Sequence, residues 1–342
     1  MGDEDRTTHR DIVVIGASAG GLSALVELVR GLPHDLPAAV FVVVHTSPDN
    51  PSVLPQILAR AGALPASLAV DGARIVRGHI HVAPPDHHLL LRRGHLRVAR
   101  GPKENGFRPA VDPLFRTAAR IHGPRVIGVV LSGGLNDGTH GLALIAQRGG
   151  VAFVQDPQEA LVPSMPLSAL QSVEVHHVLR AAELGPAITR RVHESIPAVP
   201  YGEEVIDVAD HGDSLARHVP TGAPSPYTCP DCGGALWETS DETRVLRYRC
   251  HVGHGYTAES LAAGQQHNLD NALWTALRAL EEHASLYRRM ATRTADAGLG
   301  ELARRYRDQV DHTERRAATI REALAHHPHS HHDDHAPQEE PP

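Results

Sequence analysis

Short apolar runs that alternate with amphipathic stretches, from residue 11 to about residue 180, constrain the fold of this chain most strongly. The runs are rich in β-branched residues, as buried strands are, and comprise Ile12–Ile15, Val40–Val44, Val126–Leu131 and Val151–Val154. Between them apolar residues recur at helical spacing, at Leu22, Leu25, Val26 and Val29 and in segments 112–121 and 138–148. Strands that alternate with helices predict an α/β fold, with a doubly wound, mostly parallel sheet covered by helices on both faces.

Composition divides the chain into further segments. Residues 74–98 carry Gly and Pro-Asp turn signals, which predict an antiparallel hairpin extension of the main domain at 11–195. A linker rich in Pro, Gly and Ser at 196–226 precedes a Cys-bearing segment at 227–258. Two long amphipathic patterns, interrupted by glycines, predict a helical hairpin at 259–325. The leader at 1–10 and the His-rich tail at 326–342 are expected to be disordered.

Bulk properties exclude several classes of protein. A net charge of −7 over 342 residues gives no overall basic field, so we expect no nucleic-acid partner. The longest apolar run, at 38–44, is far too short to cross a bilayer, and we expect no membrane insertion. The three cysteines all lie between 229 and 250, which excludes a disulfide framework and favours a cytoplasmic protein.

A Gly-x-Ser-x-Gly pentapeptide, Gly16–Gly20, directly follows the first predicted strand and opens a helix. In that context small neighbours permit a sharp turn that exposes the Ser18 hydroxyl, and the N–H groups at the helix start can stabilise an oxyanion. The same pentapeptide also occurs in tight turns without catalysis. A dinucleotide-binding turn is disfavoured, because the spacing is not G-x-G-x-x-G and the second strand ends in His45 instead of an acidic residue.

Two further side chains at strand ends fit a catalytic triad with Ser18. His45 closes the second strand, and Asp137 lies in a Gly-rich loop, 132–138, after a third strand. Ligands bind at the carboxyl ends of parallel strands, so the three residues are expected to meet there. Asp137 would then orient His45, which would take the proton of Ser18. The alternatives are a surface histidine, one of 26 in the chain, and an Asp that caps a helix.

These motifs together resemble the catalytic domain of the chemotaxis protein-glutamate methylesterase, CheB, over roughly residues 11–190. The resemblance rests on the segments IGASAGG, FRPAVDPLF and VVLSGGLNDGTHGL, on the strand that ends in His45, and on GHIHVAPPDHHLLL, which matches the family's hairpin region. It implies that Ser18, His45 and Asp137 are the triad and that Arg108 belongs to a segment lining the cleft.

The resemblance also implies an activity. It is the removal of methyl esters from glutamate side chains of chemoreceptor-like signalling proteins, with glutamine deamidation as a side activity and no cofactor for catalysis. The backbone N–H groups of Ala19 and Gly134 would bind the oxyanion. The implied partners are a methylated chemoreceptor or receptor-like protein and a methyltransferase or histidine kinase. The alternative is a non-catalytic regulatory scaffold that binds signalling partners through the C-terminal half.

Two features depart from the family pattern. Chemotaxis members carry an N-terminal receiver domain, whereas the catalytic motif here starts at residue 11, so we expect no control by phosphorylation in cis. The Asp loop usually reads T-G-M-G-x-D-G, whereas this chain has Gly134 in place of Met and Leu135 in place of Gly. The chain is most similar to stand-alone CheB-like proteins that end in a zinc-ribbon-like segment.

Cys229-x2-Cys232 and Cys250-x3-His254, separated by 17 residues, predict a Cys3His zinc site. A metal stabilises a segment that is too short to bury its own core. His251 is a less favoured fourth ligand, because the side chains of the neighbouring residues Cys250 and His251 converge poorly on one ion. The alternative to a metal site is three unpaired thiols. Four protein ligands leave no open coordination position, so the expected zinc ion is structural.

Overall fold

The computed structural model describes residues 7–46, 52–198, 201–202, 222–239, 243 and 245–326. The chain forms two compact units, Met1–Gly264 and Gln265–Pro342. Most of the predicted leader, the predicted linker and nearly all of the predicted His-rich tail lie outside the described residues. No helix in the described ranges has an apolar stretch sufficient to span a membrane.

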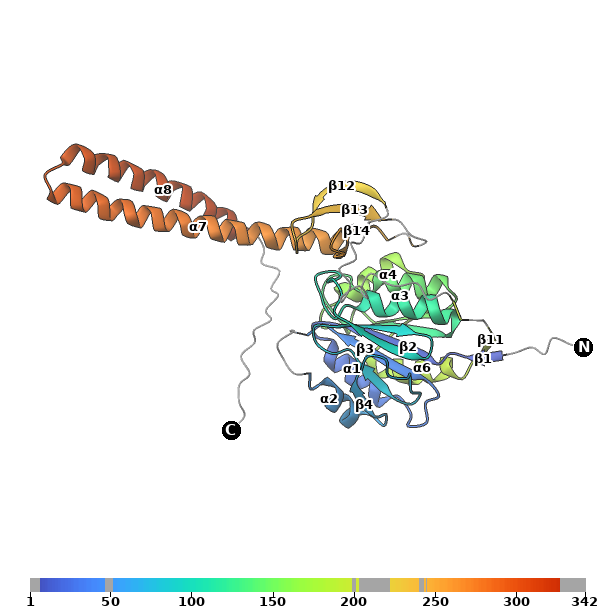
Figure 1. Cartoon of the computed structure of the whole chain (residues 1–342). Helices are drawn as coiled ribbons and strands as arrows, with labels where there is room; N and C mark the ends of the chain where they lie inside the picture. Colours follow the sequence, from blue (N-terminus) through green and yellow to red (C-terminus); the bar gives the residue numbers. More distant parts are fainter. Residues whose placement is uncertain are drawn as a thin grey trace, which may run out of the picture. The chain divides into compact units, whose positions relative to one another are not determined.

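A seven-stranded sheet with the order β10-β9-β8-β2-β3-β5-β4 forms the centre of the first unit (Figure 1). Its strands are β2 (Ile12–Ala17), β3 (Ala39–Val44), β4 (Ala66–Leu68), β5 (Ile80–Val82), β8 (Val126–Val130), β9 (Val151–Gln155) and β10 (His177–Leu179). All neighbouring strands pair in parallel, which confirms the doubly wound sheet. The chain winds outward from β2 through β3 and then returns to β8 on the other side, so the strand order reverses at β2.

Helices cover both faces of this sheet, as the alternating pattern predicts (Figure 1). One face carries α1 (Gly21–Arg30), α2 (Leu54–Ala61) and α6 (Ala181–Val192), and the other carries α3 (Val111–His122), α4 (Thr139–Gln147) and α5 (Ser164–Ser172). Successive side chains of β2 pack on opposite faces of the sheet, so Val13 belongs to one apolar core and Val14 to the other. A strand buried on both faces therefore reads as a continuous apolar run.

The hairpin region differs from the expectation. Its first strand, β5, is a parallel member of the main sheet between β3 and β4. Only β6 (His88–Arg92) and β7 (His95–Ala99) form an antiparallel hairpin, and it is a separate two-stranded sheet. It packs on α3 through apolar side chains, and the Leu91 N–H donates to Thr117 Oγ1 at 3.1 Å. A further antiparallel pair joins β1 (Thr7–His9) to β11 (Ser195–Pro197). Strand β11 therefore includes the first two residues of the predicted linker.

The Cys-bearing segment forms a four-stranded antiparallel sheet. Its strands are β12 (Ala223–Thr228), β13 (Ala235–Thr239), β14 (Arg247–Cys250) and β15 (Gly255–Thr257). The sheet begins four residues before the expected boundary at 227. We call residues 223–264, which include the first seven residues of α7, the ribbon segment. Its apolar core is small and consists of Cys229, Leu236, Tyr248, Cys250, Tyr256 and Leu261.

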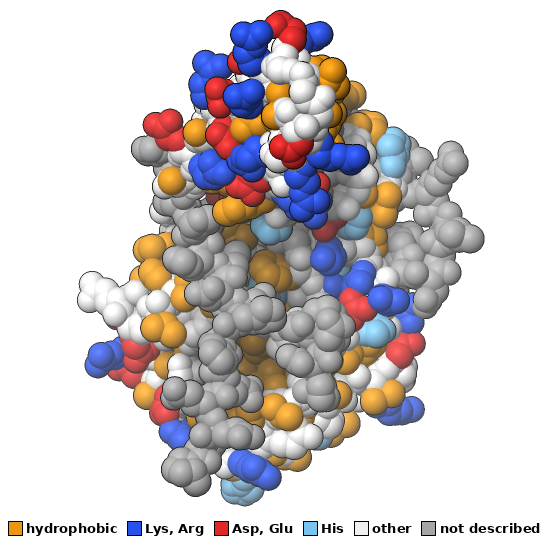
Figure 2. All heavy atoms as spheres, turned by 90° about the vertical axis from the view of Figure 1, so that its left-hand side faces the viewer, with side chains coloured by type: hydrophobic (Ala, Val, Ile, Leu, Met, Phe, Trp, Pro, Cys, Tyr) orange, Lys and Arg blue, Asp and Glu red, His pale blue; other side chains and the backbone are white. Residues whose placement is uncertain are grey.

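The second unit is the predicted helical hairpin, formed by α7 (Ala258–Asp296) from Gln265 onward and α8 (Gly300–His326). Leu277, Ala317 and Leu324 are buried between the helices. Arg321 pairs with Glu281 across the hairpin at 2.7 Å, and Arg288 pairs with Glu314. Basic and acidic side chains are interspersed along it, at the top of Figure 2.

Asp11 ties the amino-terminal ends of three strands together, at the edge opposite the predicted site. It precedes β2, and its carboxylate pairs with Arg125 before β8 at 2.7 Å and with Arg77 before β5. Burial alone would favour the protonated acid, but the two guanidinium groups outweigh it and hold the pKa of Asp11 below its usual range.

Replacing this carboxylate should therefore destabilise the fold. We expect Asp11→Asn to lower the free energy of unfolding by about 2–3 kcal/mol at pH 7, because two guanidinium groups lose their buried counter-charge. The pKa of Asp11 is lower in the folded protein than in the unfolded chain. The stabilisation by the Asp11 carboxylate is therefore fully present above about pH 4 and is lost as the pH falls through the pKa of Asp11 in the folded protein. Urea unfolding of both proteins at pH 7 and pH 3 tests this, and an equal difference at the two pH values would contradict it.

Candidate active site

The structure brings Ser18, His45 and Asp137 together at the carboxyl edge of the sheet. Ser18 follows β2, His45 follows β3, and Asp137 lies between β8 and α4, so the central position of β2 places the other two on either side of the serine. His45 Nδ1 lies 3.0 Å from Ser18 Oγ, and His45 Nε2 lies 2.8 Å from Asp137 Oδ2. A continuous hydrogen-bonded chain therefore joins hydroxyl, imidazole and carboxylate.

Small residues allow the Ser18 turn and the Asp137 loop to approach each other closely. A Cβ atom at Gly21 would lie 2.8 Å from the Ser132 carbonyl oxygen, and one at Gly133 would lie 2.8 Å from Ser18 Cβ. Gly20 adopts a φ of 72°, which glycine reaches without strain. The Ser18 N–H donates to the Ser132 carbonyl at 3.0 Å and so locks the two loops together.

The Asp137 carboxylate is fully buried and accepts hydrogen bonds from five groups. The donors are His45 Nε2, Asn105 Nδ2 and the backbone N–H groups of Val111, Asp112 and Gly138, at 2.6–3.2 Å. Burial alone would raise the pKa of Asp137, but the hydrogen bond and charge of His45, together with these N–H donors, hold it below the usual range. Asp137 is therefore ionised at neutral pH.

His45 is held by a ring contact that the motifs do not predict. The Phe107 ring stacks on the imidazole with 3.7 Å between ring centroids and 10° between planes, and the His45 side chain is only 4% exposed. Nδ1 faces the serine and Nε2 the aspartate, the reverse of the chymotrypsin assignment. With its Nε2–H donated to Asp137, Nδ1 is free to accept the Ser18 proton.

Asp112, at the start of α3, is a second buried carboxyl group beside the triad. It accepts hydrogen bonds from the Gly141 N–H at 2.7 Å and from Asn105 Nδ2 at 3.1 Å. Burial and the nearby charge of Asp137 raise the pKa of Asp112 to about 7. The two carboxyl groups thus differ in charge below neutral pH, where Asp112 holds a proton and Asp137 does not.

Two backbone groups remain available for an oxyanion. The Ser18 N–H is already donated, whereas no described residue accepts a hydrogen bond from the N–H of Ala19 or Gly134. Leu135, at a position where the resembled family carries Gly, adopts a φ of 60°, so this loop keeps a left-handed residue without glycine. Arg108 lies on the neighbouring loop, but Asp86 and the Gly101 carbonyl bind its guanidinium.

The predicted metal ligands converge in the ribbon segment. The ligand atoms of Cys229, Cys232, Cys250 and His254 all lie within 4.8 Å of one another. The His254 Nδ1 atom lies 3.6 Å from the sulfurs of both Cys229 and Cys250, and the Cys232 and Cys250 sulfurs are 3.7 Å apart. A tetrahedral zinc ion with bonds of about 2.0–2.3 Å separates its ligands by roughly 3.5–3.8 Å, so the site fits zinc. His251 instead packs against Trp237, with ring centroids 4.2 Å apart.

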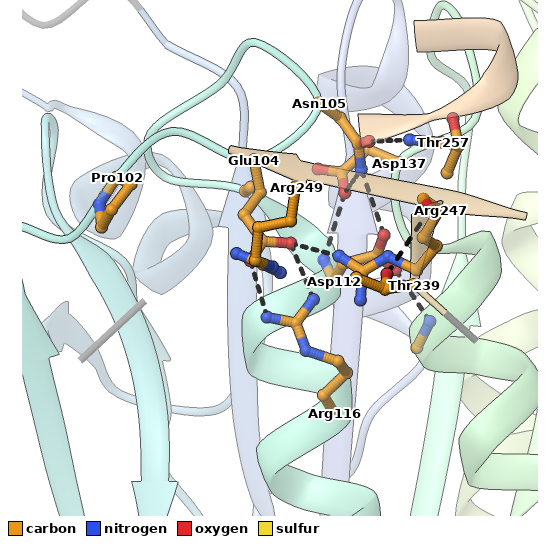
Figure 3. Close-up of polar contacts among 12 residues, drawn as sticks. Pro102, Glu104, Asn105, Asp112, Arg116, Asp137, Thr239, Arg247, Arg249 and Thr257 are labelled. Atoms are coloured by element: carbon orange, nitrogen blue, oxygen red, sulfur yellow. Dashed lines mark hydrogen bonds and ion pairs between the residues drawn. The ribbon is translucent and has the colours of Figure 1, made fainter. Parts of the chain in front are cut away.

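A buried ion cluster joins the ribbon segment to the loop before α3 (Figure 3). Glu104 is completely buried and pairs with Arg116 of α3 at 2.8 Å and with Arg247 and Arg249 of β14 at 2.7 Å. Burial would raise the pKa of Glu104, but the three positive charges hold it well below the usual range. The motifs did not predict this cluster, although Arg247 and Arg249 alternate as residues on one face of a strand do.

Comparison with known proteins agrees with this geometry. A family model described as CheB methylesterase matches residues 13–188. A protein-glutamate methylesterase/protein-glutamine glutaminase of Myxococcus xanthus is 36% identical over 183 residues, covering 53% of this chain and 52% of the relative. One from Anaeromyxobacter dehalogenans is 38% identical over 183 residues, covering 54% of each. The chain therefore spans about half the length of these curated relatives.

A solved structure matches the same region. The crystal structure of the Thermotoga maritima CheB methylesterase catalytic domain superposes with a TM-score of 0.51 and 31% identity, covering 54% of this chain and 99% of that one. The family match, the parallel sheet and the meeting of three polar side chains at its carboxyl edge all concern the same part of the chain. This chain belongs to the CheB methylesterase family.

Proposed function

We propose that this protein is a protein-glutamate methylesterase in which Ser18 is the nucleophile, His45 the general base and Asp137 the residue that orients His45. The hydrogen-bonded chain from Ser18 Oγ through His45 to the buried Asp137 carboxylate is the observation that carries this proposal. An acyl-transfer site needs a nucleophile beside a base and a third group that fixes the base, and these three side chains supply those parts.

The reaction follows from the order of the groups. Ser18 Oγ attacks the carbonyl carbon of a glutamyl γ-methyl ester while its proton passes to His45 Nδ1. The N–H groups of Ala19 and Gly134 stabilise the negative charge on the carbonyl oxygen, each by a factor of about 100–1000. His45 then protonates the leaving methoxide, and methanol departs. Water, activated by His45, attacks the acyl-Ser18 ester and releases glutamate. A glutamine side chain would lose ammonia by the same steps.

The substrate and setting are part of the same proposal. The relatives are named for action on protein glutamate and glutamine, so we assign a methylated chemoreceptor or receptor-like protein as the substrate. A methyltransferase that installs the ester and a histidine kinase that reads receptor output are the corresponding partners. The three cysteines form no disulfide, as is typical of proteins in a reducing compartment, which supports a cytoplasmic location.

We also propose that the ribbon segment binds a structural zinc ion through Cys229, Cys232, Cys250 and His254. The converging ligand atoms support this assignment, as does the small core of the segment, which needs a further source of stability. With four protein ligands the ion would order the turns that carry them and leave the hydrolytic chemistry to Ser18.

Loss of the triad should abolish hydrolysis. We expect Ser18→Ala and Asp137→Asn each to lower kcat by about 10⁴-fold or more, because the nucleophile or the orientation of the base is lost. Methanol release from a peptide with a glutamyl γ-methyl ester measures this. Ser23→Ala removes an exposed hydroxyl from the same helix start and serves as the control with unchanged activity. Equal, measurable rates for Ser18→Ala and the wild type would refute Ser18 as the nucleophile, whereas no methanol release from either protein would favour a regulatory scaffold.

The zinc assignment can be tested with a matched pair of histidine variants. We expect His254→Gln to lose most of its bound zinc, because one of four ligands is removed, and His251→Gln to retain it, because His251 packs on Trp237. Metal analysis of the purified proteins after equal dialysis measures the difference. Zinc loss in His251→Gln with retention in His254→Gln would reverse the ligand choice.

A further inference from the structure

The turn at 104–107 contacts two of the three triad residues. Glu104 and Phe107 exchange backbone hydrogen bonds of 3.1 and 2.9 Å, which close the turn. Within it, Asn105 Nδ2 donates to Asp137 Oδ1 at 2.9 Å, and the Phe107 ring covers His45. The position of this turn therefore decides where both the imidazole and the carboxylate lie.

The ribbon segment, which lies beyond the family-matched region, holds this turn through its backbone. The Gly255 N–H donates to the Lys103 carbonyl at 3.2 Å, and the Asn105 N–H donates to the Gly255 carbonyl at 2.8 Å. The start of β15 is thus paired with residues 103–105 as a parallel bridge.

A backbone N–H and a hydroxyl of the ribbon segment hold the side-chain amide of Asn105, which faces Asp137 (Figure 3). Asn105 Oδ1 accepts hydrogen bonds from the Thr257 N–H at 3.1 Å and from Ser260 Oγ at 2.8 Å. Because its oxygen is fixed in this way, the Asn105 amide nitrogen must point toward the carboxylates of Asp112 and Asp137. Two donors from the ribbon segment thereby set the orientation of a donor to the triad.

The residue before Asp137 is bound by the same segment. Thr257 Oγ1 lies 2.8 Å from Asn136 Oδ1, and Asn136 Nδ2 donates to Glu259 Oε2 at 2.7 Å. Asn136 is buried, and these contacts satisfy both ends of its amide. The Asp137 loop is therefore held on one side by Asn105 and on another by Asn136, and both depend on residues 257–260.

The ion pairs of Glu104 oppose separation of the ribbon segment from the turn at 104–107. Its carboxylate is fully buried, and two of its three positive partners, Arg247 and Arg249, belong to the ribbon segment. If the ribbon segment withdrew, the buried Glu104 carboxylate would retain only Arg116 as a positive partner. This state is strongly unfavourable unless the turn itself rearranges. The conformation of the turn and the docking of the ribbon segment are thus coupled.

We propose that the ribbon segment is a positioning element of the active site, which holds turn 104–107 and the Asn105 amide against Asp137. This inference rests on the proposed function. Cys250 and His254 bracket the turn between β14 and β15, and the Cys250 N–H donates to the His254 carbonyl at 3.1 Å. Arg249 precedes this turn and Gly255 follows it, so metal binding there would order the residues that touch the catalytic domain. Reactivity of Ser18 therefore depends on the state of a segment that contributes no reacting atom.

Removal of one hydroxyl tests the proposal in the full chain. We expect Ser260→Ala to lower kcat for a glutamyl methyl ester peptide about tenfold with KM unchanged, because one hydrogen bond that orients Asn105 is lost. The second-order rate of Ser18 labelling by a fluorophosphonate should fall by a similar factor, while an unchanged final labelling stoichiometry shows that the variant is folded. Ser225→Ala removes a hydroxyl of the ribbon segment that donates to the Leu236 carbonyl and does not contact Asn105. This control variant should leave both rates unchanged.

Metal removal provides the second measurement. Chelation should slow Ser18 labelling of the wild type, addition of Zn²⁺ should restore it, and the fractional effect should be smaller in Ser260→Ala, because both changes act through Asn105. Wild-type labelling rates in Ser260→Ala, or faster labelling after chelation or in that variant, would overturn the positioning role. A wild-type protein that neither hydrolyses the ester nor labels at Ser18 would instead overturn the proposed function, and the positioning role with it.

Discussion

The buried carboxylate of Asp137 is the constraint on which the rest of the site depends. A buried, ionised carboxylate is very costly unless hydrogen-bond donors surround it. Here the donors come from the end of β3, the turn at 104–107, the start of α3 and the loop of Asp137 itself. Satisfying this one charge therefore fixes four separate segments of the chain relative to one another. The alignment of His45 with Ser18 follows from that arrangement.

The sequence predicts the part of this arrangement that simple rules control. Long β-branched runs mark the inner strands, and the ends of parallel strands meet at one edge, so sequence alone predicts that Ser18, His45 and Asp137 lie together. The short strands β4, β5 and β10 have three residues each, too few to show a period. The expected hairpin extension accordingly missed that β5 belongs to the parallel sheet.

The contacts that orient the triad could not be predicted, because they join residues distant in the sequence and have no motif. Asn105 lies in an irregular turn, where an amide carries no pattern that distinguishes it from a surface residue. Phe107 opens the segment FRPAVDPLF, but the resemblance to the family gives its ring no role. Glu104 is separated by 143 residues from Arg247 and by 145 from Arg249. The alternation of the two arginines indicates that they share a face of a strand, but not which surface that face meets.

Three buried carboxyl groups lie close to one another, and the groups around each one determine its charge and its role. Glu104 is neutralised by arginines, which makes it a structural anchor. Asp112 has its pKa raised to about 7, so it escapes much of the cost of its charge by binding a proton. Asp137 is satisfied by His45 and by neutral N–H donors, without a direct arginine partner among the described residues. Its negative charge is therefore not cancelled and can stabilise the imidazolium that forms when His45 takes the Ser18 proton. An arginine in place of Asn105 would satisfy the same carboxylate but would remove that stabilisation.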